Sequence, residues 1–121
     1  QSRDFTFVKD VVQANLLAAT ASNEDATNQV YNVAVGDRTS LNQLYFHLRD
    51  NLAERFEHLK DAQPIYRDFR AGDVRHSLAD ISKGKNLMGY QPTHVIGEGL
   101  KEAMDWYVGF LNRQAPVAEK R

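Results

Sequence analysis

Residues 2–10 of the chain read SRDFTFVKD, and residues 69–80 read FRAGDVRHSLAD. Each stretch places an arginine close to an aspartate at the edge of an apolar, strand-like run. Arginine carries a planar fork of N–H donors that matches phosphate oxygens, and it stays charged at any working pH. A neighbouring aspartate can accept hydrogen bonds from sugar hydroxyls. The two stretches therefore have the residue types that bind a phosphorylated ligand bearing hydroxyl groups.

The composition is that of one soluble globular domain. The 121 residues suffice for one hydrophobic core, and 42% hydrophobic with 26% charged residues is ordinary for such a domain. A net charge of -1 argues against a surface built broadly for nucleic acid, and no apolar run is long enough to cross a bilayer. The absence of cysteine excludes disulfides and thiolate metal sites. We expect a cytoplasmic protein without nucleic-acid or membrane partners.

Helices dominate the predicted secondary structure. Asp10 and Gln13 have capping-box spacing, which predicts a well-buried helix that starts after Asp10 and runs through residue 21. Thr39 or Ser40 is predicted to cap a second helix that ends near residue 60, and Asp80 a third that ends at residue 89. A last helix is predicted over residues 95–112.

Two further segments have the composition of short strands. Residues 30–35 (VYNVAV) end at a Gly-Asp turn, and residues 65–69 follow a proline. The prediction is therefore an α/β chain, rich in helices and with short strands.

The order of the motifs resembles a known family. The two arginine-bearing stretches, with YNVAVGDRTSL between them and GYQPTHVIGEGL after them, are similar to the C-terminal part of extended short-chain dehydrogenase/reductases of the NAD-dependent epimerase/dehydratase family, above all bacterial UDP-N-acetylglucosamine 4-epimerases. The resemblance implies that residues 1–113 form the C-terminal substrate-binding portion of a Rossmann-type nucleotide-sugar epimerase. Residues 114–121 (QAPVAEKR) are expected to be a flexible polar tail. We expect the N-terminal Rossmann part to be missing from this chain.

The resemblance also implies three substrate-binding residues. In the family, arginines that match Arg3 and Arg70 contact the diphosphate of a UDP-sugar, and an acid that matches Asp73 bonds the uridine ribose. Gly72 is expected to adopt a positive φ or to let the backbone approach the ligand. Taken alone, Arg3 would be expected to form a solvated ion pair. Asp4 is interpreted as holding a backbone turn.

The residues that carry out chemistry in the family are not found in this sequence. It has no G-x-G-x-x-G fingerprint for NAD and no Tyr-x-x-x-Lys pair, in which the tyrosine takes a proton from the sugar 4-hydroxyl. We therefore expect NAD to be bound by the missing N-terminal part, no catalytic or cofactor-binding residue in this chain, and no activity from it alone. The four histidines lack the spacing of a metal site, so no metal is expected.

The predicted function is the UDP-anchoring part of a UDP-sugar 4-epimerase that acts on N-acetylated or plain hexoses. Two alternatives stay open. A nucleotide-sugar 4,6-dehydratase or UDP-glucuronate decarboxylase shares the anchoring motifs, and a non-catalytic helical interaction module is an alternative of another class. The intact enzyme is expected to be a homodimer. If apolar faces pack on the Rossmann part, this chain should expose them.

Overall fold

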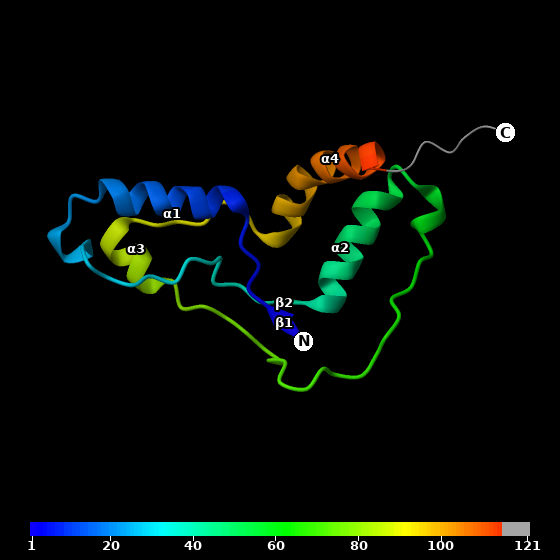
Figure 1. Ribbon diagram of the computed structural model, residues 1–121, viewed down its shortest axis with the longest axis horizontal. Helices are drawn as coiled ribbons and strands as arrows, with labels where there is room; N and C mark the ends of the chain where they lie inside the picture. Colours follow the sequence, from blue (N-terminus) through cyan, green and yellow to red (C-terminus); the bar gives the residue numbers. More distant parts are fainter. Residues whose placement is uncertain (115–121) are drawn as a thin grey trace.

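The structure, a computed structural model, describes residues 1–114. Two pairs of helices lie on either side of a short sheet: α1 lies beside α3, and α2 packs on α4 (Figure 1). In chain order the elements are β1 (Ser2–Arg3), α1 (Val8–Thr20), η1 (Glu24–Ala26), β2 (Thr39–Ser40), α2 (Leu41–Ala53), η2 (Glu57–Leu59), α3 (Ser82–Met88) and α4 (Ile96–Gln114). The helix-rich fold with short strands is confirmed. Residues 115–121, nearly all of the predicted tail, lie outside the described residues.

β1 contacts two segments that are distant from it in the sequence. It pairs antiparallel with β2, with Ser2 opposite Ser40 and Arg3 opposite Thr39. On its other side Ser2 forms a parallel bridge to His76. There the Ser2 amide donates to the Arg75 carbonyl at 2.8 Å, and the Ser77 amide donates to the Ser2 carbonyl at 3.1 Å. The second arginine-bearing stretch is thereby attached to the first.

The strands predicted at residues 30–35 and 65–69 are wrong. Within residues 1–114 the structure has only the β1–β2 sheet, and neither segment has a neighbouring strand with which to exchange hydrogen bonds. Side chains bind the end of the first segment instead. The Asp4 carboxylate accepts from the amides of Val35 (3.0 Å) and Gly36 (2.9 Å), and the Tyr90 hydroxyl donates to the Ala34 carbonyl at 2.7 Å. Asp4 therefore holds backbone, as interpreted from the sequence.

The start of α1 also differs from the prediction. The helix begins at Val8 after Phe7, which makes no side-chain cap, so Asp10 lies inside the first turn. Asp10 is fully buried and accepts from the Thr93 amide (2.8 Å), the Thr93 hydroxyl (2.7 Å) and the His94 amide (3.2 Å). The predicted cap is wrong because partners from a distant segment take the carboxylate, which instead fastens α1 to the segment before α4.

The remaining helix ends follow local signals more closely. Ser40 caps α2 and forms the reciprocal capping box with Gln43. α3 ends at Met88, and its C-cap Gly89 has a left-handed φ of 71°. Asp80 was predicted as the cap of α3, but the N-cap position is held by Ile81, and the Asp80 carboxylate accepts from the Ser82 amide at 2.9 Å. α2 ends at Ala53, earlier than predicted, and the chain continues into η2.

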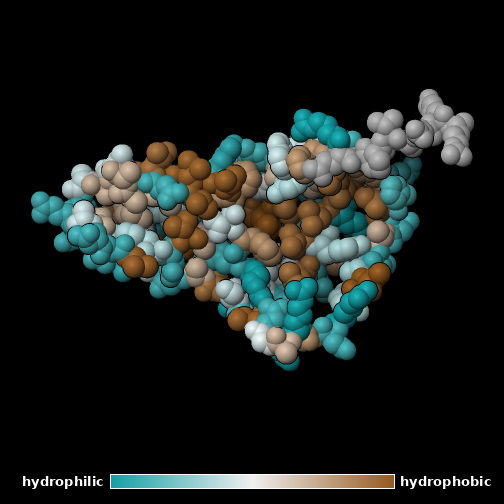
Figure 2. All heavy atoms as spheres, viewed as in Figure 1, coloured by the Kyte–Doolittle hydropathy of each residue, from teal (hydrophilic) through white to brown (hydrophobic). Residues whose placement is uncertain are grey.

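Much apolar surface is left open on the described residues. The core of Ala14, Ala34, Ile81 and Tyr90 is small. Of α1, only Asp10 and Ala14 are buried, so the prediction of a well-buried helix is wrong. Apolar side chains lie along the outside of α1 (Figure 2). No helix within residues 1–114 is both long and apolar enough to cross a membrane.

Candidate functional site

A cavity of about 660 Å³ lies between the first turns of α2 and the loop that follows η2. We call it the arginine cavity, and it contains two of the three predicted site residues, Arg70 and Asp73. The residues that line it are Gln1, Leu41, Asn42, Tyr45, Pro64, Ile65, Tyr66, Arg67, Asp68, Phe69, Arg70 and Asp73. Three chain segments far apart in the sequence therefore share this space.

Arg3 and Asp73 contact each other. The Arg3 Nη2 donates to Asp73 Oδ1 at 2.8 Å, and the exposed fractions of the two side chains are 29% and 32%. The Gln1 side-chain amide donates to the other carboxylate oxygen of Asp73. The Arg3 Nη1 also donates to the carbonyls of Ser2 (2.8 Å) and Arg75 (3.4 Å). Arg3 thus forms an ion pair, as expected for it taken alone, but the partner lies 70 positions away. The pair holds Asp73 at the edge of the cavity.

Arg70 has an open guanidinium. No ion pair within residues 1–114 involves its side chain, which is exposed in the arginine cavity. Its carbonyl accepts from the Asp73 amide at 3.3 Å, which closes a tight turn. Gly72 has a φ of 80° in this turn, and nothing lies within 4 Å of the place where a Cβ would be. The glycine is needed for the left-handed backbone rather than for a close approach.

The charges and shapes in the cavity suit one kind of ligand. Arg67 and Arg70 lie on one loop, and neither forms an ion pair within residues 1–114, so both can meet an anion. Asp73 offers acceptor atoms for hydroxyl groups. Tyr45 and Tyr66 add aromatic surface. Arg67 and Tyr45 were not selected as site residues from the sequence. The repeat of the tripeptide RDF at residues 3–5 and 67–69 could have drawn attention to Arg67.

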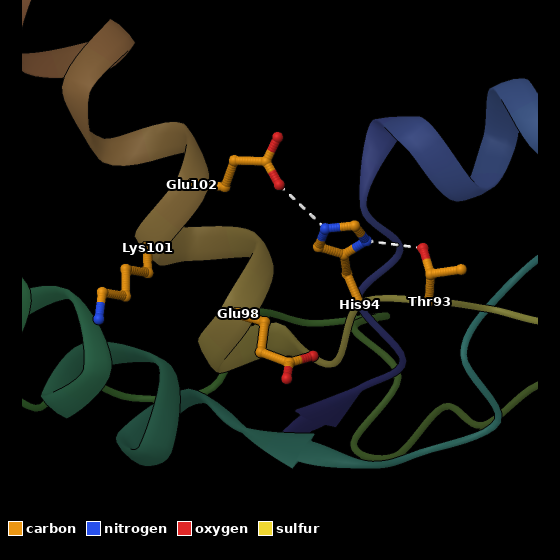
Figure 3. Close-up of a pocket in the computed structure, with 5 residues that line it drawn as sticks. All are labelled: Thr93, His94, Glu98, Lys101 and Glu102. Carbon is orange, nitrogen blue, oxygen red and sulfur yellow. Dashed lines mark hydrogen bonds and ion pairs between the residues drawn. The ribbon is translucent and has the colours of Figure 1, made fainter.

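A second cavity, of about 400 Å³, lies at the start of α4 (Figure 3). His94 Nε2 is 2.9 Å from Glu102 Oε2, and His94 Nδ1 is 2.7 Å from the Thr93 hydroxyl. Lys9 on α1 also pairs with Glu102, and the hydrogen bond from Lys9 is the main cause of the lowered pKa of Glu102. The opposite charges of Lys9 and Glu102 neutralise each other, and the pair joins α1 to α4. We assign this cavity a structural role.

Within residues 1–114, no three His, Asp or Glu side chains are grouped so that they could hold a metal ion. His76 instead bonds the buried Ser2 hydroxyl through Nδ1 at 2.8 Å.

Comparisons with known proteins identify the family of this chain. A sequence model of the GDP-mannose 4,6 dehydratase family matches residues 1–103. A UDP-glucuronate 4-epimerase of Thermodesulfobacterium geofontis is 33% identical, over 88% of this chain and 30% of the relative. The structure of the UDP-N-acetylglucosamine 4-epimerase from Methanobrevibacter ruminantium M1 in complex with UDP-N-acetylmuramic acid superposes with a TM-score of 0.76, with 35% identity over 91% of this chain and 32% of that chain.

A second solved structure gives the same result. MoeE5, in complex with UDP-glucuronic acid and NAD, superposes with a TM-score of 0.72, with 30% identity over 91% of this chain and 34% of that chain. The chain spans about a third of the length of the relatives that it matches. It corresponds to the helix-rich C-terminal portion of these proteins, and it therefore belongs to the GDP-mannose 4,6 dehydratase family of extended short-chain dehydrogenase/reductases.

Proposed function

We propose that this chain is the substrate-anchoring portion of an NAD-dependent UDP-sugar 4-epimerase, and that it holds the UDP moiety in the arginine cavity. The observation that carries the proposal is the open Arg70 guanidinium beside Asp73 in one cavity, with Arg3 in contact with Asp73. Two of the superposed proteins were solved with UDP-sugars, which is the ligand class that this set of groups suits.

The proposed contacts follow from the hydrogen-bond donors and acceptors that the three site residues carry. Arg70 places its fork on the diphosphate, because its side chain is not engaged by the described protein. Arg3 adds positive charge from the edge and keeps Asp73 in place. The Asp73 carboxylate then accepts from a ribose hydroxyl.

This arrangement fits the inversion of one sugar carbon. The sugar must present both faces of C4 in turn, so the firm hold has to lie away from the reacting carbon. Contacts to the diphosphate and the ribose meet that requirement, because they leave the sugar itself free to rotate. The chain's own contribution is therefore binding and orientation.

The residues of this chain do not fit NAD. A dinucleotide needs a glycine-rich turn that opens a helix directly after a strand. In residues 1–114 the left-handed glycines lie elsewhere: Gly36 precedes β2, Gly72 lies in the cavity loop, and Gly89 ends α3. At the start of α4 the Phe7 ring covers Gly99, 3.0 Å from the place of its Cβ. We propose that NAD is held by a Rossmann part outside this chain.

The exposed face of α1 is the proposed contact with that Rossmann part. Val8, Val12 and Leu16 follow one another at helical spacing, and their exposed fractions are 64%, 50% and 62%. Residues 30–35, which have strand composition without a strand beside them, lie in the same half of the molecule (Figure 1). A Rossmann part about twice as long as this chain would cover the apolar face of α1 and would lie beside residues 30–35. We further propose that the whole protein is a cytoplasmic homodimer.

Titration of UDP into the intact protein tests the anchoring role. Arg70→Ala should weaken UDP binding by about 1.5–3 kcal/mol, the usual cost of a lost charged hydrogen bond. Arg113→Ala is the matched control, because Arg113 lies on α4 outside the arginine cavity. Equal affinities of Arg70→Ala and the unchanged protein would refute the proposal, and absence of UDP binding would favour an interaction module.

A second candidate function is favoured by one observation, namely that the matching family is described as a 4,6-dehydratase family. Incubation of the intact protein with UDP-N-acetylglucosamine and with UDP-glucose distinguishes the two, because an epimerase returns the 4-epimer and a dehydratase a 4-keto-6-deoxy sugar. Release of carbon dioxide from UDP-glucuronate would identify a decarboxylase.

A further inference from the structure

We propose that Phe69 and Arg75 form a clamp that positions Arg70 and Asp73 for the ligand, an inference that rests on the proposed function of the arginine cavity. The Arg75 guanidinium lies over the Phe69 ring, 4.7 Å from the ring centroid. The two residues bracket the turn that carries Arg70 and Asp73. Phe69 lines the cavity, whereas Arg75 does not.

The loop that carries Arg70 and Asp73 has two arms, residues 63–69 before the turn and residues 74–77 after it. The arm after the turn is firmly attached to β1. The Arg75 carbonyl accepts from the Ser2 amide at 2.8 Å and from Arg3 Nη1 at 3.4 Å. The Ser77 amide donates to the Ser2 carbonyl, and His76 bonds the Ser2 hydroxyl. The backbone of this arm is therefore fixed at Arg75.

The other arm has no such attachment. None of the backbone hydrogen bonds found outside the regular elements of residues 1–114 involves residues 63–69. The exposed fraction is 85% for Ile65, 70% for Tyr66 and 56% for Phe69, so burial holds this arm weakly. The contact of Phe69 with Arg75 joins the loose arm to the fixed one.

The turn between the arms needs this help to stay in place. It is closed by a single backbone hydrogen bond of 3.3 Å, from the Asp73 amide to the Arg70 carbonyl. Asp73 is held from β1, but the Arg70 side chain is not held by any ion pair within residues 1–114. A loop that moves freely would have to be ordered when the ligand binds, and that ordering weakens binding. Phe69 and Arg75 are positioning residues because they order the turn in advance.

A double-mutant cycle on UDP binding by the intact protein tests the clamp. A cation–π contact of this exposure corresponds to about a two- to fivefold loss of affinity, expected for Phe69→Leu and for Arg75→Gln. The double variant should bind no more weakly than the weaker single variant. Arg75→Lys keeps a cation over the ring and should recover most of the affinity.

The chain offers a matched control. Arg49 lies over Phe46 at 4.8 Å on α2, and neither residue lines the arginine cavity. Arg49→Gln removes the same kind of contact and the same charge, and should leave UDP binding unchanged.

The outcomes separate the clamp from the function on which it rests. If Arg70→Ala loses UDP but Arg75→Gln does not, or if the losses in the double variant add fully, the clamp is refuted and the anchoring role stands. If the unchanged protein does not bind UDP, the anchoring role is refuted, and the clamp is then judged by hydrogen exchange. The Asp73 amide should exchange faster in both single variants than in the unchanged protein, and equal rates would overturn the clamp.

Discussion

Removal of the Asp10 carboxylate should destabilise the chain more than the removal of any exposed aspartate. The carboxylate is fully buried and accepts three hydrogen bonds, from the Thr93 amide, the Thr93 hydroxyl and the His94 amide. The Asp10→Ala variant leaves two backbone amides without an acceptor. The Thr93 hydroxyl keeps His94 Nδ1 as a second partner at 2.7 Å, so its loss counts for little.

The magnitude follows from those two amides. A buried donor left without a partner costs about 1–3 kcal/mol, which gives about 2–6 kcal/mol for the pair. Thr93 itself is exposed, so water can replace part of what its amide loses. We therefore expect Asp10→Ala to lower the free energy of unfolding by about 2–4 kcal/mol. Asp10→Asn keeps one acceptor oxygen and should lose less.

The same site sets the response to acid. Burial raises the pKa of Asp10, but the hydrogen bonds from Thr93 and His94 and the charge of His94 lower it more, so that the folded-state pKa lies below the ordinary 3.8. A group whose pKa is lowered by folding stabilises the fold above its unfolded-state pKa. The contribution of Asp10 is thus complete above pH 3.8 and lost as the pH falls through the folded-state value.

Urea unfolding at neutral pH and at a series of acidic pH values measures both effects. Asp10→Asn should be less stable than the unchanged chain at neutral pH, and the difference should shrink below pH 3.8, where the unchanged chain also loses the charge. Asp61→Asn is the control, since the Asp61 side chain is exposed and its carboxylate makes no ion pair within residues 1–114. Stability of Asp10→Ala within about 0.5 kcal/mol of the unchanged chain, the range of ordinary surface substitutions, would refute the reasoning.

Two other substitutions probe the packing around the site's supports. Gly99→Ala brings a Cβ to 3.0 Å from the Phe7 ring and should lower the free energy of unfolding by about 1–3 kcal/mol in thermal or urea unfolding. Gly109→Ala is the control: nothing lies within 4 Å of its Cβ position, so this variant should be neutral or stabilising. A neutral Gly99→Ala would mean that Phe7 can move aside. Tyr90→Phe removes the hydroxyl that donates to the Ala34 carbonyl at 2.7 Å in the core and should cost about 1–3 kcal/mol, with unchanged stability counting against that bond.

The helix ends could be predicted wherever the signal and its partner lie within one turn. The cap of α2 and the end of α3 depend on neighbouring residues: Thr39 or Ser40 was predicted as the cap and Ser40 is the one observed, and the predicted helix end at Gly89 is the observed C-cap. Asp10 and Gln13 have the same spacing as a capping box, yet Gln13 bonds the backbone of Gln91 instead. Such long-range partners compete with local ones, and spacing alone does not reveal which partner a side chain takes.

The prediction of strands failed for a related reason. Residues 30–35 have the composition of a strand, but a strand exists only where a second strand exchanges hydrogen bonds with it. Within residues 1–114 no strand lies beside this segment, and Asp4 and Tyr90 bind its backbone in part. The two residues of β1, by contrast, pair because both β2 and the segment at His76 reach them.

The binding roles of the three predicted site residues stay predictions, but the structure shows where these residues lie. Arg70 and Asp73 do share a cavity, and Arg3 reaches it through Asp73. The contact between Arg3 and Asp73 joins residues 70 positions apart, and neither motif specifies it. Arg3 is therefore an ion-pair partner of a residue that lines the arginine cavity, whereas local sequence had presented an ion pair and a place at the candidate site as alternatives.

The repeated tripeptide RDF shows why local sequence stops short of a role. In residues 3–5 the aspartate is Asp4, which binds backbone amides, and the phenylalanine faces an apolar groove between α2 and α4. In residues 67–69 the arginine and the aspartate line the arginine cavity, and Phe69 lies under Arg75. The three side chains are the same in both copies. The first copy starts in β1, which pairs with β2, and is half-buried, whereas the second lies on an exposed loop. The function of each copy is set by the segments packed against it, so the Phe69–Arg75 contact is a property of this fold rather than of the motif.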